Sequence, residues 1–495
     1  MSKILKKLGS ENIFFAVLFL SILFFLNFHS IFFLNPRSFH FIRQTDTLSF
    51  VSYYLKNDLN FFNVGNLNLY NESGKTLCEF PILYYLTALI SKLGAKSYLV
   101  LKTIHLIFFF LTSYTIFNYL RNKFSFINAV SITYLLFSST VILYYSVNHI
   151  PNYPALCLSL CGIVYFLKYL ESNTRIFFNI SMVLFLFACL IKITFAVYPI
   201  GFLIFLIIKW MKNRKYEKYA IAVFFLLFSV LLVWNLYVLH YNKINNADYY
   251  LTHIKPIWSM SSTEVKEVFL FIINYWVYKY YYHSAIHTFF IVLIISMFFY
   301  KNFKKDQLLL SFIFLSGTFF YFILFFKQFR DHDYYFMEFV PLFFLIFVNS
   351  YEAIIFHLNT KIKIAISLFI MLITVLSINY AKLNLNRRYS SPFEQVSRIA
   401  YVLENSDAKL DSLGIPENAK ILVVPDFTMN GSLFLLDRFG YTVGDTLNSN
   451  MASYFSKSDY ILISDSSYLN NMKNKFKLTS PILKYRTTEL FKISH

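Results

Sequence analysis

Long apolar segments alternate with short polar ones over most of this chain, and this alternation is the strongest signal in the sequence. A run of roughly 17–25 mainly apolar residues is long enough to cross a bilayer as a helix. By this criterion we expect about eleven membrane-spanning helices within residues 1–381. They cover residues 13–34, 98–120, 125–145, 151–169, 177–190, 194–210, 219–240, 285–300, 308–326, 339–353 and 362–380. The pattern therefore predicts a polytopic α-helical membrane protein.

Lysine and arginine residues indicate which of the connecting loops face the cytoplasm. Lys3, Lys6 and Lys7 precede the first span, and every second loop after it is short and basic. Cytoplasmic loops carry such an excess of positive charge, so we expect a cytoplasmic N-terminus. No small-residue cleavage site follows the first apolar run, which favours an uncleaved span over a signal peptide. On this alternation, loop 35–81 and the tail 382–495 lie outside.

The outer loop 35–81 is the first long polar interruption of the chain, and it contains two acidic residues in distinct settings. Apolar residues recur at helical spacing over positions 48–59, with polar residues between them. This spacing predicts an amphipathic helix that lies along the membrane surface, with Asp46 at its N-terminal end. Glu79 comes just before Pro81, where another helix is expected to begin.

Two interpretations of these acids are open. Asp46 either caps its helix, because Asp satisfies the free N–H groups of a helix start, or acts as a general base at a cavity mouth. The two roles are compatible. Glu79 either complements the helix dipole or belongs to the site. Because its neighbours are Cys78, Phe80 and Pro81, Glu79 is poorly placed to be only a solvated surface charge.

Other charged residues beside the spans are candidates for the same outer site. Lys192 lies between two apolar runs, and ionisable residues in such positions usually face a polar cavity. Lys192 and Arg43 are therefore candidate contacts for an anion, the alternative being anchoring at the membrane surface. The densest charge cluster beside a span comprises Arg330, Asp331, His332 and Asp333, followed by Tyr334 and Tyr335. It is either a solvated loop end or part of a cavity that holds a phosphate-bearing lipid.

The tail 382–495 differs in pattern from the rest of the chain. Short apolar runs at 420–424 and 460–463 each end in a polar turn, and a helix-like stretch at 431–439 lies between them. Alternating strand and helix signals predict a small α/β domain. No glycine-rich phosphate-binding loop is present in the sequence, which argues against a nucleotide site.

Composition agrees with a membrane protein and excludes several other classes. The chain is 57% hydrophobic and 14% charged, with a mean hydropathy of +0.53, whereas soluble domains carry about 25% charged residues. The net charge of +19 is distributed in short clusters between apolar runs, so it indicates orientation in a bilayer and no nucleic-acid partner. The four cysteines imply no disulfide framework.

Several of these stretches together resemble glycosyltransferase family 39, whose members have the GT-C fold and include lipid A aminoarabinose transferases and protein O-mannosyltransferases. The matching pieces are Arg43-Gln44-Thr45-Asp46-Thr47, Glu79-Phe80-Pro81, Asn148-His149-Ile150-Pro151-Asn152, Lys192-Ile193-Thr194, Lys255-Pro256-Ile257-Trp258, His332-Asp333-Tyr334-Tyr335, Leu413-Gly414-Ile415-Pro416 and Val424-Pro425-Asp426. Phe80 stands where the aminoarabinose transferases have a lysine, so a phosphate contact must come from elsewhere, such as Arg43 or Lys192.

The resemblance implies a function and a set of roles. The chain would transfer a hexose or pentose from a polyprenyl-phosphate donor to a lipid, glycan or protein acceptor, on the outer face of a bacterial cytoplasmic membrane. Asp46 would be the catalytic base. Glu79 would join the catalytic site, and in some family members the corresponding acid helps to bind a divalent metal ion. Arg43, Lys192, Arg330, His332, Asp333 and Tyr335 would contact the substrate or its phosphate.

Two other functions fit a chain of this kind. One is a transporter or flippase of lipid-linked sugars, and the other is a glycan polymerase. A transporter is expected to place ionisable groups near the bilayer midplane, often in repeated halves. Here they gather at one surface and no repeat is visible, so we favour the inverting glycosyltransferase.

Overall fold

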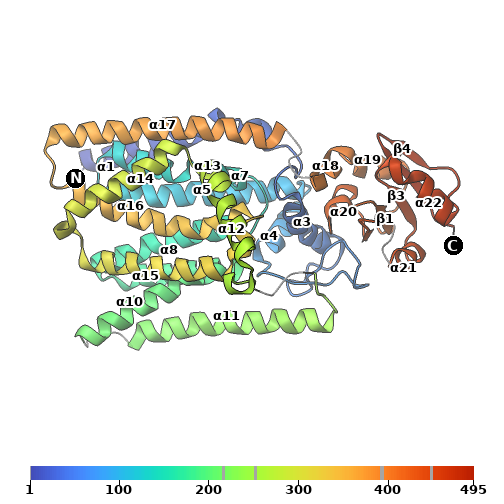
Figure 1. Ribbon diagram of the computed structural model, residues 1–495, viewed down its shortest axis with the longest axis horizontal. Coiled ribbons are helices and arrows are strands. Elements are labelled where there is room, and N and C mark those ends of the chain that lie inside the picture. Colours follow the sequence, from blue (N-terminus) through green and yellow to red (C-terminus); the bar gives the residue numbers. More distant parts are fainter. Residues whose placement is uncertain (1, 214–217, 250–253, 391–394, 446–449, 495) are drawn as a thin grey trace.

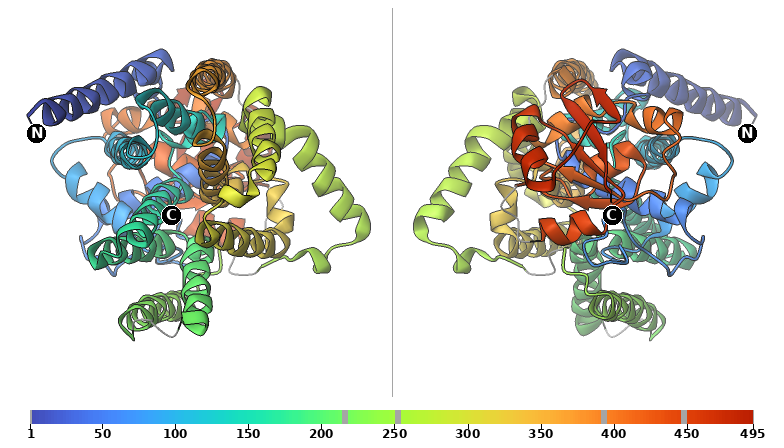
Figure 2. Two further views of the ribbon diagram at one scale, coloured as in Figure 1. Left: turned by 90° about the vertical axis from the view of Figure 1, so that its left-hand side faces the viewer. Right: turned by 90° about the vertical axis from the view of Figure 1, so that its right-hand side faces the viewer.

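The computed structural model describes residues 2–213, 218–249, 254–390, 395–445 and 450–494. A bundle of helices forms most of the molecule, and a small domain with a β-sheet lies at one end of it (Figure 1). The chain starts at the opposite end of the bundle and finishes within this domain. Viewed along the bundle, the domain overlies its central helices, while α1 and α11 lie at the periphery (Figure 2). The two ends of the bundle therefore have different surroundings.

One set of bundle helices follows the apolar runs. They are α1 (Ser2–Phe25), α5 (Ser97–Arg121), α6 (Phe126–Phe137), α7 (Thr140–Tyr145), α8 (Asn152–Ser172), α9 (Arg175–Ile191), α10 (Val197–Asn213), α11 (Lys218–Ile244), α14 (His283–Phe298), α15 (Lys305–Leu324), α16 (Val340–Ile355) and α17 (Thr360–Ser390). The other helical elements of the bundle and its connections are α2 (Phe28–Ile31), α3 (Phe41–Lys56), α4 (Ile82–Ser91), α12 (Ser262–Phe271), α13 (Val277–Tyr280), the π-helix η3 (Ile272–Trp276) and the 3₁₀ helices η1 (Ile193–Ala196), η2 (Ile257–Ser259), η4 (Tyr300–Asn302), η5 (Phe326–Phe329) and η6 (Asp333–Phe339).

The prediction of a multi-pass membrane protein is confirmed, but the count of eleven spans is not. Within the described residues, seven helices are long and apolar enough to cross a membrane, or eight if the pair 262–280 and 283–298, bent by 100°, is one span. The other three predicted spans lie on apolar helices of 10–17 residues: Gly9–Phe25 within α1, α6 and α9. The predicted span 125–145 is broken because Ser139 caps a new helix, its hydroxyl accepting a hydrogen bond from the Ile142 N–H.

Burial separates the central helices from the lipid-facing ones. In α8, 78% of an apolar 18-residue stretch is buried inside the molecule, whereas the corresponding share in α11 is 22%. α8 packs closely on α9 at Gly162, where an added Cβ would lie 2.8 Å from the Phe185 ring. The exposed apolar face of α11 is typical of a surface in contact with lipid, because soluble proteins rarely expose so large an apolar surface to water.

The C-terminal domain has the predicted α/β character. Its five strands are β1 (Ile421–Val424), β2 (Gly440–Thr442), β3 (Tyr460–Ile463), β4 (Leu483–Tyr485) and β5 (Thr488–Lys492). They form one sheet in the order β2-β1-β3-β5-β4, parallel from β2 to β3 and antiparallel from β3 to β4. Its helices are α18 (Arg398–Val402), α19 (Ser406–Ser412), α20 (Gly431–Leu436), α21 (Met451–Ser456) and α22 (Leu469–Phe476), with 3₁₀ turns η7 (Gln395–Ser397) and η8 (Ser466–Tyr468). α17 continues to Ser390, past the predicted domain boundary at residue 382.

The first outer loop fills the space between bundle and domain, and the prediction of a surface helix there is wrong. α3 is buried almost all round from Gln44 to Tyr54, because α4 and α5 pack on one side of it and α20 of the C-terminal domain on another. The loop after α3 then pairs with the edge of the sheet. Gly440 donates to the carbonyl of Leu67 at 3.1 Å and accepts from the N–H of Leu69 at 2.8 Å. The polar side of α3 therefore packs against protein. The spacing of its apolar residues instead predicts that this side faces water.

Candidate active site

Asp46 lies in the second turn of α3 and is buried, with 2% of its surface exposed. Asn430 donates from Nδ2 to Oδ1 of its carboxylate at 2.8 Å, and the Tyr249 hydroxyl donates to Oδ2 at 3.2 Å. The N-cap of α3 is His40, so the interpretation of Asp46 as a helix cap is wrong. Burial raises the pKa of Asp46 to about 6, against the opposing effects of the Asn430 hydrogen bond and the Arg43 charge. An acid with this pKa is ionised at neutral pH and still accepts a proton readily.

Glu79 and Arg43 form a close ion pair next to Asp46. Nη2 of Arg43 donates to both carboxylate oxygens of Glu79, at 2.7 Å and 2.9 Å, and the Tyr84 hydroxyl donates to Oε1. Burial opposes ionisation of Glu79, but the Arg43 charge and the hydrogen bonds from Cys78 and Tyr84 outweigh it and lower its pKa. Arg43 also interacts electrostatically with Asp46, so the two acids share one cation.

The described side chains around Glu79 do not form a three-ligand metal site. Among the described residues no group of three or more His, Cys, Asp and Glu side chains is close enough to hold an ion. Both oxygens of Glu79 are engaged by Arg43. A metal ion at Glu79 therefore stays a prediction from the family resemblance.

Lys192 follows α9 and brings a second cation to this end of the bundle. Its ammonium lies 5.0 Å from the centre of the Tyr335 ring. The charge of Glu338, in η6, also acts on it, and Glu338 accepts hydrogen bonds on Oε1 from Thr194 at 2.6 Å and Asn152 at 3.1 Å. No carboxylate oxygen within the described chain lies within 4.0 Å of the Lys192 ammonium. This cation therefore retains capacity to bind an anion.

Asp333 is held in a separate buried network. Nη2 of Arg388 is 2.7 Å from Oδ2, the Tyr145 hydroxyl donates to Oδ1 at 2.8 Å, and Nε2 of His40 is 3.3 Å from Oδ1. These partners come from α17, α7 and the start of α3, so the network ties the first outer loop to the last long helix. Both oxygens of Asp333 are engaged, which makes this acid a structural anchor in the arrangement observed.

The remaining members of the predicted charge cluster lie in different environments. Arg330 and Asp331 are exposed at the end of the bundle. The His332 ring stacks on Tyr334 and Tyr335, with ring centres 5.3 Å and 5.7 Å apart. Burial lowers the pKa of His332 to about 4, which makes it a neutral ring near pH 7. Of the cluster, Tyr335 contacts Lys192 and His332 is affected by the Lys192 charge, whereas Arg330 and Asp331 are exposed.

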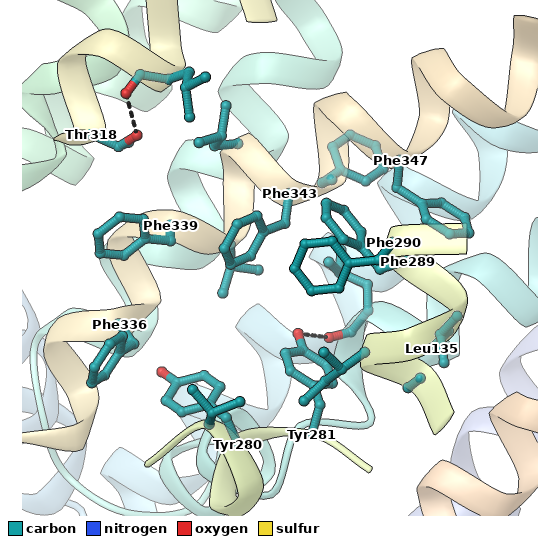
Figure 3. A pocket seen from close by; sticks show the side chains of 18 of the residues that line it. Leu135, Tyr280, Tyr281, Phe289, Phe290, Thr318, Phe336, Phe339, Phe343 and Phe347 are labelled. Carbon is teal, nitrogen blue, oxygen red and sulfur yellow. Dashed lines mark hydrogen bonds between the residues drawn. The ribbon is translucent and has the colours of Figure 1, made fainter. Parts of the chain in front are cut away.

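A large apolar pocket adjoins this charged region within the bundle. It has a volume of about 500 Å³ and lies between α6, α14, α15 and α16. Phenylalanine and tyrosine rings surround it, among them Tyr280, Phe289, Phe336, Phe339 and Phe343 (Figure 3). Phe336 and Phe339 belong to η6, the same short helix that carries Tyr335 and Glu338. One element therefore lines both the apolar pocket and the charged site.

Comparisons with known proteins bear on this arrangement. Residues 79–234 match the family model described as dolichyl-phosphate-mannose-protein mannosyltransferase. The stretch begins at Glu79, includes Lys192 and ends within α11. A comparison with curated protein sequences finds no match.

Two solved structures resemble this one over almost its whole length. They are ArnT from Cupriavidus metallidurans in the apo state, with a TM-score of 0.63, and the same protein bound to undecaprenyl phosphate, with a TM-score of 0.62. Each is 10% identical and covers 97% of this chain and 98% of its own. The chain has the GT-C fold. The predicted fold class is thereby confirmed, and the resemblance to glycosyltransferase family 39 is supported by an independent sequence match.

In this GT-C chain the structure brings together Asp46, Arg43, Glu79 and Lys192, as the sequence motifs predict. Sequence reasoning missed Asn430 and Tyr249, which hold the two oxygens of Asp46, and Arg388, which pairs with Asp333. Asn430 precedes a short helix, and its only sequence signal is that of an ordinary helix cap. Nothing in the linear pattern indicates that its side chain reaches α3.

Proposed function

We propose that this chain transfers a sugar from a polyprenyl-phosphate-linked donor to an acceptor on the outer face of a bacterial cytoplasmic membrane. The family match and the shared fold support a membrane glycosyltransferase with a lipid-linked donor, since one ArnT structure is described as bound to undecaprenyl phosphate. The observation that carries the proposal is the buried carboxylate of Asp46 beside Arg43, with the second cation Lys192 near Arg43, at the end of the bundle that meets the C-terminal domain.

The reaction that suits these groups is an inverting displacement. A hydroxyl or amine of the acceptor attacks the anomeric carbon of the donor sugar, and the bond from that carbon to the phosphate oxygen breaks. Asp46 takes the proton of the attacking group, and polyprenyl phosphate leaves with the bonding electron pair. The raised pKa of Asp46 suits this task, because a base is most effective when its pKa lies near the working pH.

The two cations have different parts in this scheme. Arg43 is already fixed by Glu79, so it provides a positive charge in a set position beside Asp46. Lys192 contacts an aromatic ring and has no carboxylate oxygen within 4.0 Å among the described residues, which suits an ammonium that binds the donor phosphate. Fixed positive charge stabilises the negative charge that develops on the leaving phosphate.

The apolar pocket offers room for the isoprenoid chain of the donor. Ala285 of α14 lines this pocket, and the side chain of tryptophan in its place would fill part of the 500 Å³ volume. We expect Ala285→Trp to raise the KM for a long-chain donor at least tenfold, because each excluded CH₂ group forfeits about 0.8 kcal/mol. Turnover of a donor with a short, water-soluble chain should stay within about twofold of the unmodified protein. Initial rates of lipid phosphate release with both donors provide the measurement.

A matched control for this substitution lies on α11. Ala222 is exposed on the outer surface of the bundle, so Ala222→Trp adds the same side chain without entering the pocket. An equal loss with both donors in Ala285→Trp, or the same loss in both variants, would contradict a chain-binding role for the pocket.

We propose in addition that the N-terminus is cytoplasmic and the C-terminal domain outside. The basic loops support this orientation, as does the position of the domain at the end opposite the start of α1 (Figure 1). A membrane-impermeant maleimide applied to intact spheroplasts should label Glu417→Cys, an exposed position of the domain, but label Lys301→Cys, in η4, only after permeabilisation. Labelling of Lys301→Cys alone in intact spheroplasts would invert the topology.

The proposed function is tested with the purified protein and a panel of polyprenyl-phosphate sugars that includes hexoses and pentoses. Release of polyprenyl phosphate and gain of mass on the acceptor are read by mass spectrometry. Lipid, glycan and peptide acceptors are supplied in parallel, since their chemistry decides which class is used. Release of lipid phosphate with any member would support the proposal, and binding of donors without release from any of them would count against an enzyme.

A further inference from the structure

Asn430 is a residue of the C-terminal domain whose side chain is fully buried against the first outer loop. It occupies the N-cap position of α20, where asparagine usually accepts a hydrogen bond from the helix N–H groups. No such capping bond is present here. The carboxamide instead extends to α3 and contacts Asp46, which lies 384 residues earlier in the chain. Asn430 therefore does not cap its own helix and instead forms a hydrogen bond to a residue that is distant in the sequence.

The hydrogen bonds around Asn430 fix the direction of its carboxamide. The backbone N–H of Asn68 lies 3.2 Å from Oδ1, and because an N–H can only donate, Oδ1 must face the loop. The Ser49 hydroxyl also donates to Oδ1 at 3.0 Å, while its own oxygen accepts from the Leu67 N–H at 2.7 Å. Nδ2 is consequently directed at Asp46, where it donates at 2.8 Å. If the amide were reversed, Nδ2 would face the Asn68 N–H, another donor, and Oδ1 would face the Asp46 carboxylate, another acceptor.

The domain interface holds Asn430 in this place by several further contacts. Asn68 donates from Nδ2 to the Met429 carbonyl at 2.7 Å, directly beside Asn430. α20 approaches α3 so closely that a Cβ on Gly431 would lie 2.6 Å from the Phe41 ring. Lys56, at the end of α3, forms an ion pair with Asp437 at 2.8 Å. The position of the Asn430 amide is thus set by the docking of the domain on the loop.

We infer that Asn430 is a positioning residue that orients the Asp46 carboxylate, so that the C-terminal domain completes the catalytic site. This inference rests on the proposed function, in which Asp46 accepts the proton of the attacking group. Asn430 holds Oδ1 and Tyr249 holds Oδ2, so the plane of the carboxylate is fixed before substrate binds. Such preorganisation favours proton transfer, because the base needs no rearrangement during the reaction.

Asn430 also opposes protonation of the base in the resting protein. The groups that face Asp46 are Arg43 on its own helix, Glu79 before α4, Tyr249 after α11 and Asn430 before α20. Of these, Asn430 has the largest lowering effect on the pKa of Asp46, because its N–H donates to the charged carboxylate. Loss of this hydrogen bond leaves burial less opposed, so the pKa of Asp46 should rise.

Replacement of Asn430 tests the inference. Asn430→Ala should lower kcat by about tenfold to a hundredfold, the range expected for a hydrogen bond to a charged group, and leave the KM for the donor within about twofold. The acidic limb of the kcat/KM profile should move up by about one pH unit. Asn430→Asp keeps the acceptor for Ser49 and Asn68 but replaces the donor by a second carboxylate oxygen, so it should move the limb further.

Asp437→Asn is the matched control at the same interface. It removes the ion pair with Lys56 and touches neither Asp46 nor Asn430, and asparagine tolerates the left-handed backbone at this position, where φ is 49°. Its kcat and pH profile should equal those of the unmodified protein. Equal losses of kcat in Asp437→Asn and Asn430→Ala, with no shift of the acidic limb in either, would show that Asn430 only helps to dock the domain.

A second measurement separates this inference from the proposed function. The protonated carboxyl of Asp46 can be followed by infrared spectroscopy as the difference between each protein and the same protein carrying Asp46→Asn, without substrate. The midpoint should lie near pH 6 in the unmodified protein and higher in Asn430→Ala. If no sugar is transferred by any variant, the proposed function fails while this titration still reports on Asn430. An unchanged midpoint would overturn the inference even in an active enzyme.

Discussion

Asp46→Asn should abolish most sugar transfer while the protein still folds and binds its donor. The substitution keeps the size of the side chain, and its Oδ1 can accept the hydrogen bond from Asn430. It removes the proton acceptor, and general-base catalysis contributes about 10²–10⁴-fold, so kcat should fall by that order. Donor affinity, measured by tryptophan fluorescence or calorimetry, should change less than about threefold. Turnover close to that of the unmodified protein would remove Asp46 from the role of base.

The same substitution should stabilise the protein at neutral pH. The pKa of Asp46 is raised from 3.8 to about 6 on folding, so the folded state binds its proton more tightly than the unfolded state does. The stability this contributes is present below pH 4 and is lost as pH rises through 6, amounting to about 2–3 kcal/mol. Asp46→Asn avoids that loss. Its Tm should exceed that of the unmodified protein at pH 7.5 and approach it near pH 4, whereas a lower Tm at pH 7.5 would contradict the buried, charged state of Asp46.

Arg388→Leu should be among the most destabilising single changes in the chain. Asp333 is fully buried, and removal of Arg388 leaves its charge without the ion-pair partner 2.7 Å away. Breaking a buried ion pair from one side lowers stability by about 3–5 kcal/mol. We expect a strong fall in Tm and in the yield of folded protein after detergent extraction, measured by size-exclusion chromatography and differential scanning fluorimetry.

Two further variants make this result specific. The double variant Arg388→Leu with Asp333→Leu removes both charges and should recover part of the loss, because no charge is left buried. Lys209→Met breaks the more exposed ion pair with Asp306 and should change stability by about 1 kcal/mol at most. Similar Tm values for Arg388→Leu and Lys209→Met would mean that the Asp333 network does not anchor the fold.

The sequence predicts the local elements of this protein better than their surroundings. Apolar runs of bilayer length locate the helices, and strand-like runs locate β1 and β3, because these signals are contained within short windows. The same reasoning places the helix at 48–59 on a membrane surface. It fails there because α20 covers the polar side of α3. The spacing of apolar residues within one helix carries no information about such a contact with a distant segment.

The candidate site follows the same division. Arg43, Asp46, Glu79 and Lys192 are recognisable as charged residues in apolar stretches, and the structure brings them together. Asn430 and Arg388 are not recognisable, since an asparagine before a helix and an arginine at a helix end have ordinary local explanations. Their importance comes from the groups they meet across the fold, and the contacts of Asp46 likewise show a buried carboxylate in place of a helix cap.

The pairing of Leu67 and Leu69 with Gly440 has a consequence for the order in which the protein matures. The loop is made early, but the strand edge and the amide that complete it are made more than 350 residues later, as the separations of 384 and 362 between Asn430 and its partners Asp46 and Asn68 indicate. In the proposed topology, the loop therefore reaches the outer side of the membrane during synthesis before its hydrogen-bonding partners in the C-terminal domain have been made. On that topology, export of the C-terminal domain supplies these contacts, so a chain that stops between residues 390 and 430 carries the membrane helices and lacks the contact from Asn430 to Asp46.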